Sequence, residues 1–218
     1  MKYAYVTLAT TEYFLKGARF LHHSLQKVNS AYPLVIMVTE NLRPIIEDDT
    51  NYNYHFIPYH KFTYQKGDRY EDTINKLQYF NLVEYDRIFF IDSDILIVEN
   101  IDEIFEVCKE DFLIGVRPDE DEGKRFCGDR VIVTPNPTIF PRVLREMKHY
   151  TDDEVCLRDI YPKYFESVTT VNFPFYERTL HMSGIQKYWE TTNFTLEMLY
   201  EMSSTEIRNY FLSAGYTF

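Results

Sequence analysis

The feature that most constrains this chain is a run of bulky apolar residues that ends abruptly in two carboxylates. Residues 88–91 read Ile-Phe-Phe-Ile, and Asp92-Ser93-Asp94 follows directly, before a second apolar run over residues 95–98. An unbroken run of β-favouring apolar side chains is typical of a strand covered on both faces, as in a parallel sheet. Two carboxylates at i and i+2 share one face of an extended segment, so they can converge on one hard cation.

The Asp-x-Asp tripeptide is common, and by itself it indicates a solvated turn more often than a metal site. Its surroundings in this chain favour the metal site. The two carboxylates stand between apolar runs, where an unpaired charge is costly to bury. Ligands of open α/β sheets also gather at the carboxyl ends of strands. We therefore expect Asp92 and Asp94 to hold a cation that bridges to the phosphates of a nucleotide.

The first forty residues predict an α/β fold. Strands are expected over residues 2–9 and 33–39, and a helix is expected over residues 13–28, where apolar side chains recur every three or four positions. A strand, a helix and a second strand in this order form a βαβ unit, so the two strands should be parallel. Neither GxGxxG nor GxxxxGK[ST] occurs, which argues against a dinucleotide fingerprint and a P-loop. Other groups must hold any nucleotide.

The rest of the chain continues this alternation without an internal repeat or a recognisable linker. A single domain over residues 1–218 is the simplest prediction. The further strands are expected over residues 54–59, 112–116 and 131–134. The further helices are expected over residues 71–83, 101–107, 138–149, from 152 onward and from 191 to the C-terminus, with loops over 61–69 and 117–124.

Charge and cysteine content exclude several classes of function. The net charge of -11 argues against a nucleic-acid-binding protein and against attraction to anionic lipid. No apolar run reaches the roughly 18 residues that a transmembrane segment needs, so none is expected. The three cysteines are odd in number and form no CxxC pair, and no signal-peptide-like apolar region opens the chain. These features favour a reducing, cytoplasmic location.

Three stretches together carry a family resemblance. They are residues 5–24 (YVTLATTEYFLKGARFLHHS), 76–105 (KLQYFNLVEYDRIFFIDSDILIVENIDEIF) and 181–189 (HMSGIQKYW). They resemble the glycogenin-like branch of glycosyltransferase family 8, in which the last stretch reads HxxGxxKPW. Here Tyr188 stands in place of the proline. The resemblance implies a single GT-A domain with a Rossmann-like, mixed, mostly parallel sheet flanked by helices.

The resemblance also implies an activity and a set of ligands. Members of this family transfer a sugar from a UDP-sugar donor to an acceptor, retain the anomeric configuration and use a divalent ion, usually Mn²⁺ (or Mg²⁺). The acceptor implied here is a glycan or a glycoprotein. The segment before His181 is shorter than in glycogenin, and no tyrosine matches its self-glucosylated residue, so self-priming is not expected.

The family's metal and phosphate contacts match specific positions of this sequence. Asp92, Asp94 and His181 match its metal ligands, and a neutral imidazole suits a manganese site beside carboxylates. Gly184 would let the backbone approach the phosphates closely. Lys187 would place a positive charge on the diphosphate.

The family's nucleotide and sugar contacts match a second group of positions. This group consists of Leu8, Ala9, Thr10, Tyr13, Phe14, Lys76 and Ser93. The residue that stacks on the base is open between two aromatic residues. The alignment through Lys16-Gly17-Ala18 favours Phe14, whereas the ring type favours Tyr13.

This sequence departs from the family in the segment that contacts the donor. The family commonly has Phe-Asn-[Ser/Ala]-Gly, and the matching residues here are Phe126-Cys127-Gly128-Asp129. Cys127 therefore replaces asparagine, and Asp129 replaces glycine. Cys127 and Gly128 are expected to border the donor, although Cys127 can equally be a small buried apolar residue.

A second departure concerns an acidic pair. The family's Asp-Gln pair matches Asp153-Glu154, so an acid replaces the amide. With Lys187, these two residues are the predicted catalytic groups. An alternative role for the acids is to stabilise the N-terminus of a helix, where carboxylates are favourable.

Both departures lie where the identity of the donor sugar is usually set. Glucose, galactose and a less common sugar such as a deoxysugar all stay open as the transferred group. A second hypothesis is a catalytically weak nucleotide-sugar-binding module of a larger glycosyltransferase assembly. A third, a metal-dependent nucleotidyltransferase, is disfavoured because no glycine-rich basic loop follows the first strand.

Overall fold

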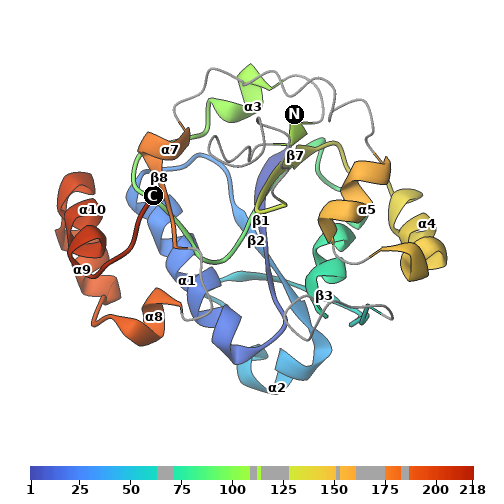
Figure 1. The fold of residues 1–218 in the computed structure, drawn as a ribbon, viewed down its shortest axis with the longest axis horizontal. Helices are drawn as coiled ribbons and strands as arrows, with labels where there is room; N and C mark the ends of the chain where they lie inside the picture. Colours follow the sequence, from blue (N-terminus) through green and yellow to red (C-terminus); the bar gives the residue numbers. More distant parts are fainter. Residues whose placement is uncertain (63–70, 109–111, 114–127, 151–152, 161–174, 183–186) are drawn as a thin grey trace.

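A mixed six-stranded sheet forms the centre of the part of the chain that the structure describes (Figure 1). The computed structural model describes residues 1–62, 71–108, 112–113, 128–150, 153–160, 175–182 and 187–218. The strand order is β3-β2-β1-β4-β7-β6. The strands are β1 (Tyr3–Ala9), β2 (Leu34–Thr39), β3 (Asn53–Ile57), β4 (Arg87–Ile91), β6 (Phe112–Leu113) and β7 (Arg130–Val133).

The direction of the strands confirms the predicted mixed, mostly parallel sheet. β1 pairs in parallel with β2 and with β4, and β2 pairs in parallel with β3. β7 is antiparallel to β4, and β6 is antiparallel to β7. Because β7 runs against β4, the start of β7 lies beside the end of β4, where Asp92 and Asp94 follow.

A second, two-stranded sheet joins distant parts of the chain. β5 (Ile95–Ile97) pairs antiparallel with β8 (Thr179–His181), so that Ile95 lies opposite His181. The sequence suggested an apolar run at β5 but no strand at β8. A three-residue segment shows no periodicity of its own, and its extended form follows from pairing with β5.

Helices cover both faces of the central sheet, as an α/β fold requires. α1 (Glu12–Lys27) begins at Thr11, whose side chain accepts a hydrogen bond from the backbone N–H of Phe14. α4 (Ile139–Glu146) and α5 (Asp153–Ile160) lie at one end of the molecule, and α9 (Leu196–Glu201) and α10 (Ser204–Ser213) lie at the opposite end (Figure 1). The other described helices are η1 (Glu40–Leu42), α2 (Arg43–Ile46), η3 (Thr73–Asn81), α3 (Ile104–Val107), η5 (Met147–His149), α7 (Phe175–Arg178) and α8 (Tyr188–Thr191).

Two predicted helices differ from those observed. The segment expected as a helix over residues 71–83 is a 3₁₀ helix, η3. The helix expected from residue 191 to the C-terminus is divided into α9 and α10. The division lies at Ser203, whose side chain and that of Glu206 form a reciprocal capping box that starts a new helix. Residues 114–124, expected to finish a strand and form a loop, lie outside the described residues.

Successive side chains along the strands pack alternately into two separate apolar clusters. Ile88 and Phe90 of β4 join the cluster that includes η3, α4 and α5, whereas Phe89 and Ile91 join the cluster that includes α1. β4 is therefore buried on both faces, which explains its unbroken apolar sequence. A third cluster joins β5 and β8 to α9 and α10. None of the described helices is long and apolar enough to cross a membrane.

Candidate active site

The turn after β4 is fixed by backbone hydrogen bonds from two sides. Within the turn, the N–H of Ile95 donates to the carbonyl of Asp92 over 3.2 Å. The N–H of Asp92 donates to the carbonyl of Asp129 over 2.9 Å, and the N–H of Met182 donates to the carbonyl of Asp94 over 3.0 Å. The Asp-Ser-Asp turn therefore lies between the start of β7 and the end of β8.

Asp94 lies between a lysine and a histidine. Its Oδ2 is paired with Lys187 Nζ, and its Oδ1 lies 3.5 Å from His181 Nε2. The residue is 6% exposed. Burial opposes ionisation, but His181 and Lys187 outweigh it and lower the pKa of Asp94 to about 2. Asp94 is thus a carboxylate at neutral pH.

His181 lies between two carboxylates. Its Nδ1 is 3.0 Å from Asp129 Oδ2, on the opposite side of the ring from Asp94. Burial alone would lower the pKa of His181, but Asp129 and Asp94 raise it to about 9. The same Asp129 oxygen accepts hydrogen bonds from Arg130 Nη2 (2.7 Å) and Nε (3.0 Å). Burial opposes the charge of Asp129, and Arg130 and His181 hold its pKa well below the usual range.

Lys76 connects the Asp92 carboxylate to α5. Its Nζ lies 2.9 Å from Asp92 Oδ1 and 3.6 Å from Asp153 Oδ2. Burial raises the pKa of Asp92, and the nearby charge of Asp94 adds to this, while the charge of Lys76 opposes it. Lys76 is thus the counter-ion that makes a second, half-buried carboxylate tolerable beside Asp94.

The acidic pair at the start of α5 faces the same region. Asp153 is 4% exposed, and the backbone N–H of Gly128 donates to Glu154 Oε1 over 3.1 Å. A Cβ atom at Gly128 would lie 2.6 Å from Asp153 Oδ2, so a larger residue there would displace this carboxylate. The two acids open a helix, as the alternative interpretation expected, and they also contact Gly128, in the turn before β7, and Lys76 of η3.

The predicted nucleotide side is built by the end of β1 and the start of α1. Thr10 Oγ1 donates to Asp72 Oδ2 over 2.9 Å. Tyr13 OH accepts a hydrogen bond of 3.2 Å from the backbone N–H of Lys187. The rings of Tyr13 and Phe14 meet edge to face at 5.3 Å, and both are half-buried, so the choice between them as a stacking residue stays open.

The other predicted positions are partly structural. Leu8 packs against the cluster that includes η3, and Ala9 belongs to the cluster that includes α1. Ser93 is buried, and its carbonyl faces α1 at Gly17. Cys127 and Gly184 lie outside the described residues.

A divalent cation fits the chemistry of one corner of the site. Asp94 Oδ1 is buried and has no hydrogen-bond partner among the described residues, and His181 Nε2 is close to it. A carboxylate oxygen and an imidazole nitrogen both suit Mn²⁺. Within the described part of the chain, no three carboxylate, imidazole or thiol groups are already spaced to hold one ion. Asp94 and His181 would hold the ion, and Asp92 can join only by exchanging Lys76 for it.

Two contacts of the site were missed at the level of sequence. Asp129 was noted only as a departure from the family, and its pairing with His181 was not foreseen. Asp72, which accepts hydrogen bonds from Thr10 and from Tyr59 (2.6 Å), was not singled out. The signal for Asp129 was present, because two adjacent charges, Asp129 and Arg130, directly precede an apolar strand.

Comparison with curated proteins finds relatives that include a glucuronosyltransferase, a galactinol synthase and a glycogenin. No family model matches the chain. Inositol phosphorylceramide glucuronosyltransferase 1 of Arabidopsis thaliana is 25% identical over 178 residues, which is 75% of this chain and 31% of that protein. Galactinol synthase 7 of the same plant is 34% identical over 52% of this chain and 36% of its own length. Glycogenin-1 of Mus musculus is 28% identical over 48% of this chain and 34% of its own length. The chain thus spans about a third of the length of these relatives.

Comparison with solved structures identifies the fold. The glycosyltransferase GlyE of Streptococcus pneumoniae TIGR4 aligns with a TM-score of 0.59 at 14% identity, covering 99% of this chain and 64% of that one. An active-site mutant of LgtC aligns with a TM-score of 0.55 at 13% identity, covering 95% of both chains. The chain has the GT-A fold, and its sequence is similar to those of a glucuronosyltransferase, a galactinol synthase and a glycogenin.

Proposed function

We propose that residues 1–218 form one GT-A domain that transfers a sugar from a UDP-sugar to a glycan or glycoprotein acceptor, with Mn²⁺ (or Mg²⁺) and with retention of configuration. The observation that carries the proposal is the pairing of both Asp-Ser-Asp carboxylates with lysines, Lys76 on Asp92 and Lys187 on Asp94, beside His181. This collects, at one edge of the sheet, the groups that a nucleoside diphosphate needs. The cysteine content favours a cytoplasmic location for the activity.

The chemistry follows from where charge develops. When the sugar leaves the diphosphate, negative charge grows on the departing phosphate oxygens. Lys187 is a cation next to Asp94, and its Nζ can transfer from that carboxylate to the diphosphate when the donor arrives. A divalent ion held by Asp94 and His181 supplies Lewis-acid stabilisation of the same charge.

The opposite charge develops on the sugar. Its anomeric carbon becomes cationic. The carboxylates of Asp153 and Glu154 open α5, where Asp153 lies across Lys76 from Asp92 and Glu154 accepts a hydrogen bond from Gly128. Negative groups held in place beside that carbon stabilise the transition state without rearranging. We propose this electrostatic role for both acids, with the acceptor hydroxyl attacking from the face that the diphosphate leaves.

A nucleotide-sugar-binding module without appreciable transfer is the second candidate. It is favoured by Glu154, because this chain has an acid where the family has an amide. Both candidates bind a nucleotide sugar, but only the enzyme turns it over. Measuring donor hydrolysis together with binding therefore separates them.

The experiment is calorimetric titration of UDP and a panel of UDP-sugars, with Mn²⁺ and with EDTA. The panel includes the glucose, galactose and glucuronic acid donors, because the relatives' names include a glucuronosyltransferase and a galactinol synthase. Manganese-dependent UDP binding with hydrolysis of one donor supports the enzyme. Binding without hydrolysis of any donor supports the module, and no binding overturns both.

Two variants test the assigned residues in the same assay. Asp94→Asn should abolish manganese-dependent UDP binding, and unchanged manganese dependence would contradict the metal assignment. Lys187→Ala should lower kcat by about 10²–10³, the effect of losing one preorganised charge-stabilising group. The control is Lys16→Ala, which removes an exposed lysine of α1. Equal losses of activity and thermal stability in Lys187→Ala would make this residue structural.

A further inference from the structure

A buried acid lies directly before β7, beside the Asp-Ser-Asp turn. Asp129 is 3% exposed and immediately precedes β7. Its carbonyl accepts the backbone hydrogen bond from Asp92, so its main chain is fixed against the Asp-Ser-Asp turn. Burying a carboxylate is costly unless it is paired, and glycine would avoid that cost altogether. The acid therefore calls for an explanation in terms of what its side chain holds.

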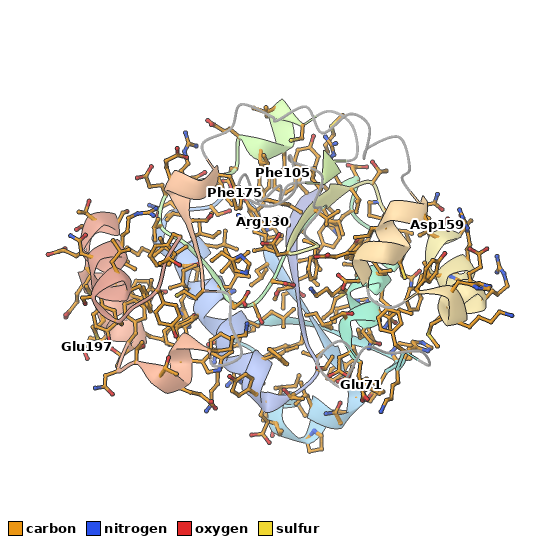
Figure 2. The ribbon with its side chains drawn as sticks, in the orientation of Figure 1. Glu71, Phe105, Arg130, Asp159, Phe175 and Glu197 are labelled. Carbon is orange, nitrogen blue, oxygen red and sulfur yellow. The ribbon has the colours of Figure 1, made fainter. Side chains whose placement is uncertain are left out.

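One oxygen of Asp129 lies within hydrogen-bonding distance of three nitrogen atoms from two residues. Arg130 Nη2 and Nε lie 2.7 Å and 3.0 Å from Oδ2, and His181 Nδ1 lies 3.0 Å from the same oxygen. Arg130 is itself 3% exposed, and its guanidinium lies 4.9 Å from the centre of the Phe175 ring. Figure 2 places Arg130 inside the molecule, close to Phe175. The carboxylate is thus anchored on one side and presented to the imidazole on the other.

We propose that Asp129 is a positioning residue for the metal-binding histidine of this site: it keeps the proton of His181 on Nδ1 and orients the ring so that Nε2 faces Asp94. The proposal rests on the proposed function and deepens it, because it assigns the group that prepares His181 for the ion.

The two ring nitrogens of a neutral histidine are not equivalent, and only the one without a proton binds a metal. Which nitrogen carries the proton is set by the partner of the other. Here Nδ1 faces Asp129, while Nε2 is 3.5 Å from the buried and otherwise unpartnered Asp94 Oδ1. A carboxylate on the far nitrogen also makes the near nitrogen a stronger ligand.

Lys187 provides no alternative explanation for this orientation, because it contacts Oδ2 of Asp94, which faces the other ring nitrogen. Among the described residues, Nδ1 of His181 lies beside Asp129. Loss of the Asp129 charge should therefore affect the ring directly.

The test compares Mn²⁺ affinity, measured by calorimetry without any donor, in the wild-type protein and in Asp129→Asn. The asparagine keeps the size of the side chain and an oxygen for Arg130, but it removes the charge that holds the Nδ1 proton. We expect a loss of Mn²⁺ affinity of about 10–100-fold, as for other second-layer carboxylates of metal sites.

The matched control is Asp102→Asn. Asp102 also receives several donors, from Tyr5 (2.8 Å), Ser30 (2.7 Å) and the backbone of Ala31 (2.7 Å), but it lies outside this cluster. The Asp102→Asn variant should have a lower unfolding temperature in EDTA than the wild type and the same Mn²⁺ affinity. Equal Mn²⁺ affinity in wild type and folded Asp129→Asn would overturn the positioning role while leaving the proposed function standing. Absence of Mn²⁺ binding by the wild type would overturn both.

A second measurement needs no variant of Asp129, which matters if that variant fails to fold. Nitrogen-15 NMR of histidine-labelled protein with Zn²⁺, a diamagnetic ion, reports the state of each ring nitrogen, and a His181→Gln variant assigns the signals. We expect a protonated Nδ1 and a metal-bound Nε2 in His181. A protonated Nε2 with a metal-bound Nδ1 would overturn the proposal.

Discussion

Gly17 lies in the middle of α1, at the point where this helix meets the site. A Cβ atom there would lie 2.4 Å from Cζ3 of the Trp189 ring and 2.5 Å from the carbonyl oxygen of Ser93. The second contact is with backbone, which cannot rotate away. The absence of a side chain at Gly17 therefore sets how closely α1 approaches both the Asp-Ser-Asp turn and the segment that follows Lys187.

Two opposite effects determine how Gly17→Ala changes the free energy of unfolding. Helix propensity alone favours alanine by about 1 kcal/mol. Overpacking against Trp189 and Ser93 costs about 1–3 kcal/mol. Because a backbone atom is one of the obstacles, we expect net destabilisation in urea unfolding together with weaker UDP binding. Lys16→Ala, one residue earlier on the exposed side of the helix, is the control, and a gain in stability by Gly17→Ala would contradict the close approach.

The buried thiol of Cys108 leads to a prediction for the stability of the protein at alkaline pH. It is 2% exposed, and burial raises the pKa of its thiol to about 11, against the opposing charge of Arg87. In the unfolded chain the thiol ionises at lower pH, near its usual value of about 8.5. The unfolded state therefore loses its proton first, and the stabilising effect is lost as pH rises from about 8.5 toward 11.

The measurement is the free energy of unfolding of the wild type and of Cys108→Ala between about pH 7 and pH 11, a range that spans both pKa values of the thiol. The variant starts lower because of the lost packing, but its stability should decline less steeply above about pH 9. Parallel declines would show that the thiol does not titrate differently in the two states.

At the scale of elements, α10 begins with a capping box formed by Ser203 and Glu206. Ser203 accepts a hydrogen bond from the N–H of Glu206, and the Glu206 carboxylate accepts one from the N–H of Ser203 over 2.7 Å. Ser203→Ala removes half of this capping box and should cost about 0.5–2 kcal/mol. Thermal unfolding followed by circular dichroism measures the loss. Ser213→Ala, which changes an exposed residue at the other end of the same helix, should change stability by much less.

The strands show what sequence patterns can and cannot predict. β4 was predicted because its residues 88–91 are all apolar, and burial on both faces is the reason. β8 was not predicted, because its three residues become a strand through pairing with β5, more than eighty positions earlier. Likewise, η3 is a 3₁₀ helix although its apolar residues allow an α-helix, because the pattern specifies a buried face and not the winding.

The candidate site divides in the same way. The resemblance named Asp92, Asp94, His181 and Lys187, and the structure brings Asp94, His181 and Lys187 into direct contact. The two carboxylates were also predicted from the apolar run that ends at Asp92, whereas His181 and Lys187 were predicted from the resemblance alone. The partnership of Asp129 with His181 was not predicted, because the resemblance leads one to expect glycine at position 129. It becomes visible only when β7 is placed antiparallel to β4.

At the scale of the whole molecule, the C-terminal helices support the site from behind. Tyr188, which follows Lys187, is fully buried, and its ring meets that of Phe211 in α10 at 5.4 Å. The two rings belong to the cluster that also contains β5 and β8. The position of Lys187 therefore depends on a helix that contributes no residue to the site.

Phe211→Ala should expose this dependence. Loss of a fully buried phenylalanine costs about 3–5 kcal/mol. UDP affinity, measured at a temperature where the variant is still folded, should also fall, because Tyr188 loses its contact with the Phe211 ring. Leu212→Ala is the matched control, since Leu212 is the next residue and is 48% exposed. An unchanged UDP affinity in folded Phe211→Ala would contradict the coupling.

The antiparallel pairing of β5 with β8 has a consequence for how the chain acquires its function during synthesis. Asp94 belongs to the first half of the chain, whereas its partners His181 and Lys187 follow more than eighty residues later. Contacts between residues so far apart in sequence form late in folding, after the local elements. A ribosome that has passed Asp94 has already made Lys76, the partner of Asp92, but the imidazole and ammonium partners of Asp94 do not yet exist. Until the segment with His181 and Lys187 emerges and β8 pairs with β5, Asp94 lacks both of these partners, and ligand binding marks the completion of folding.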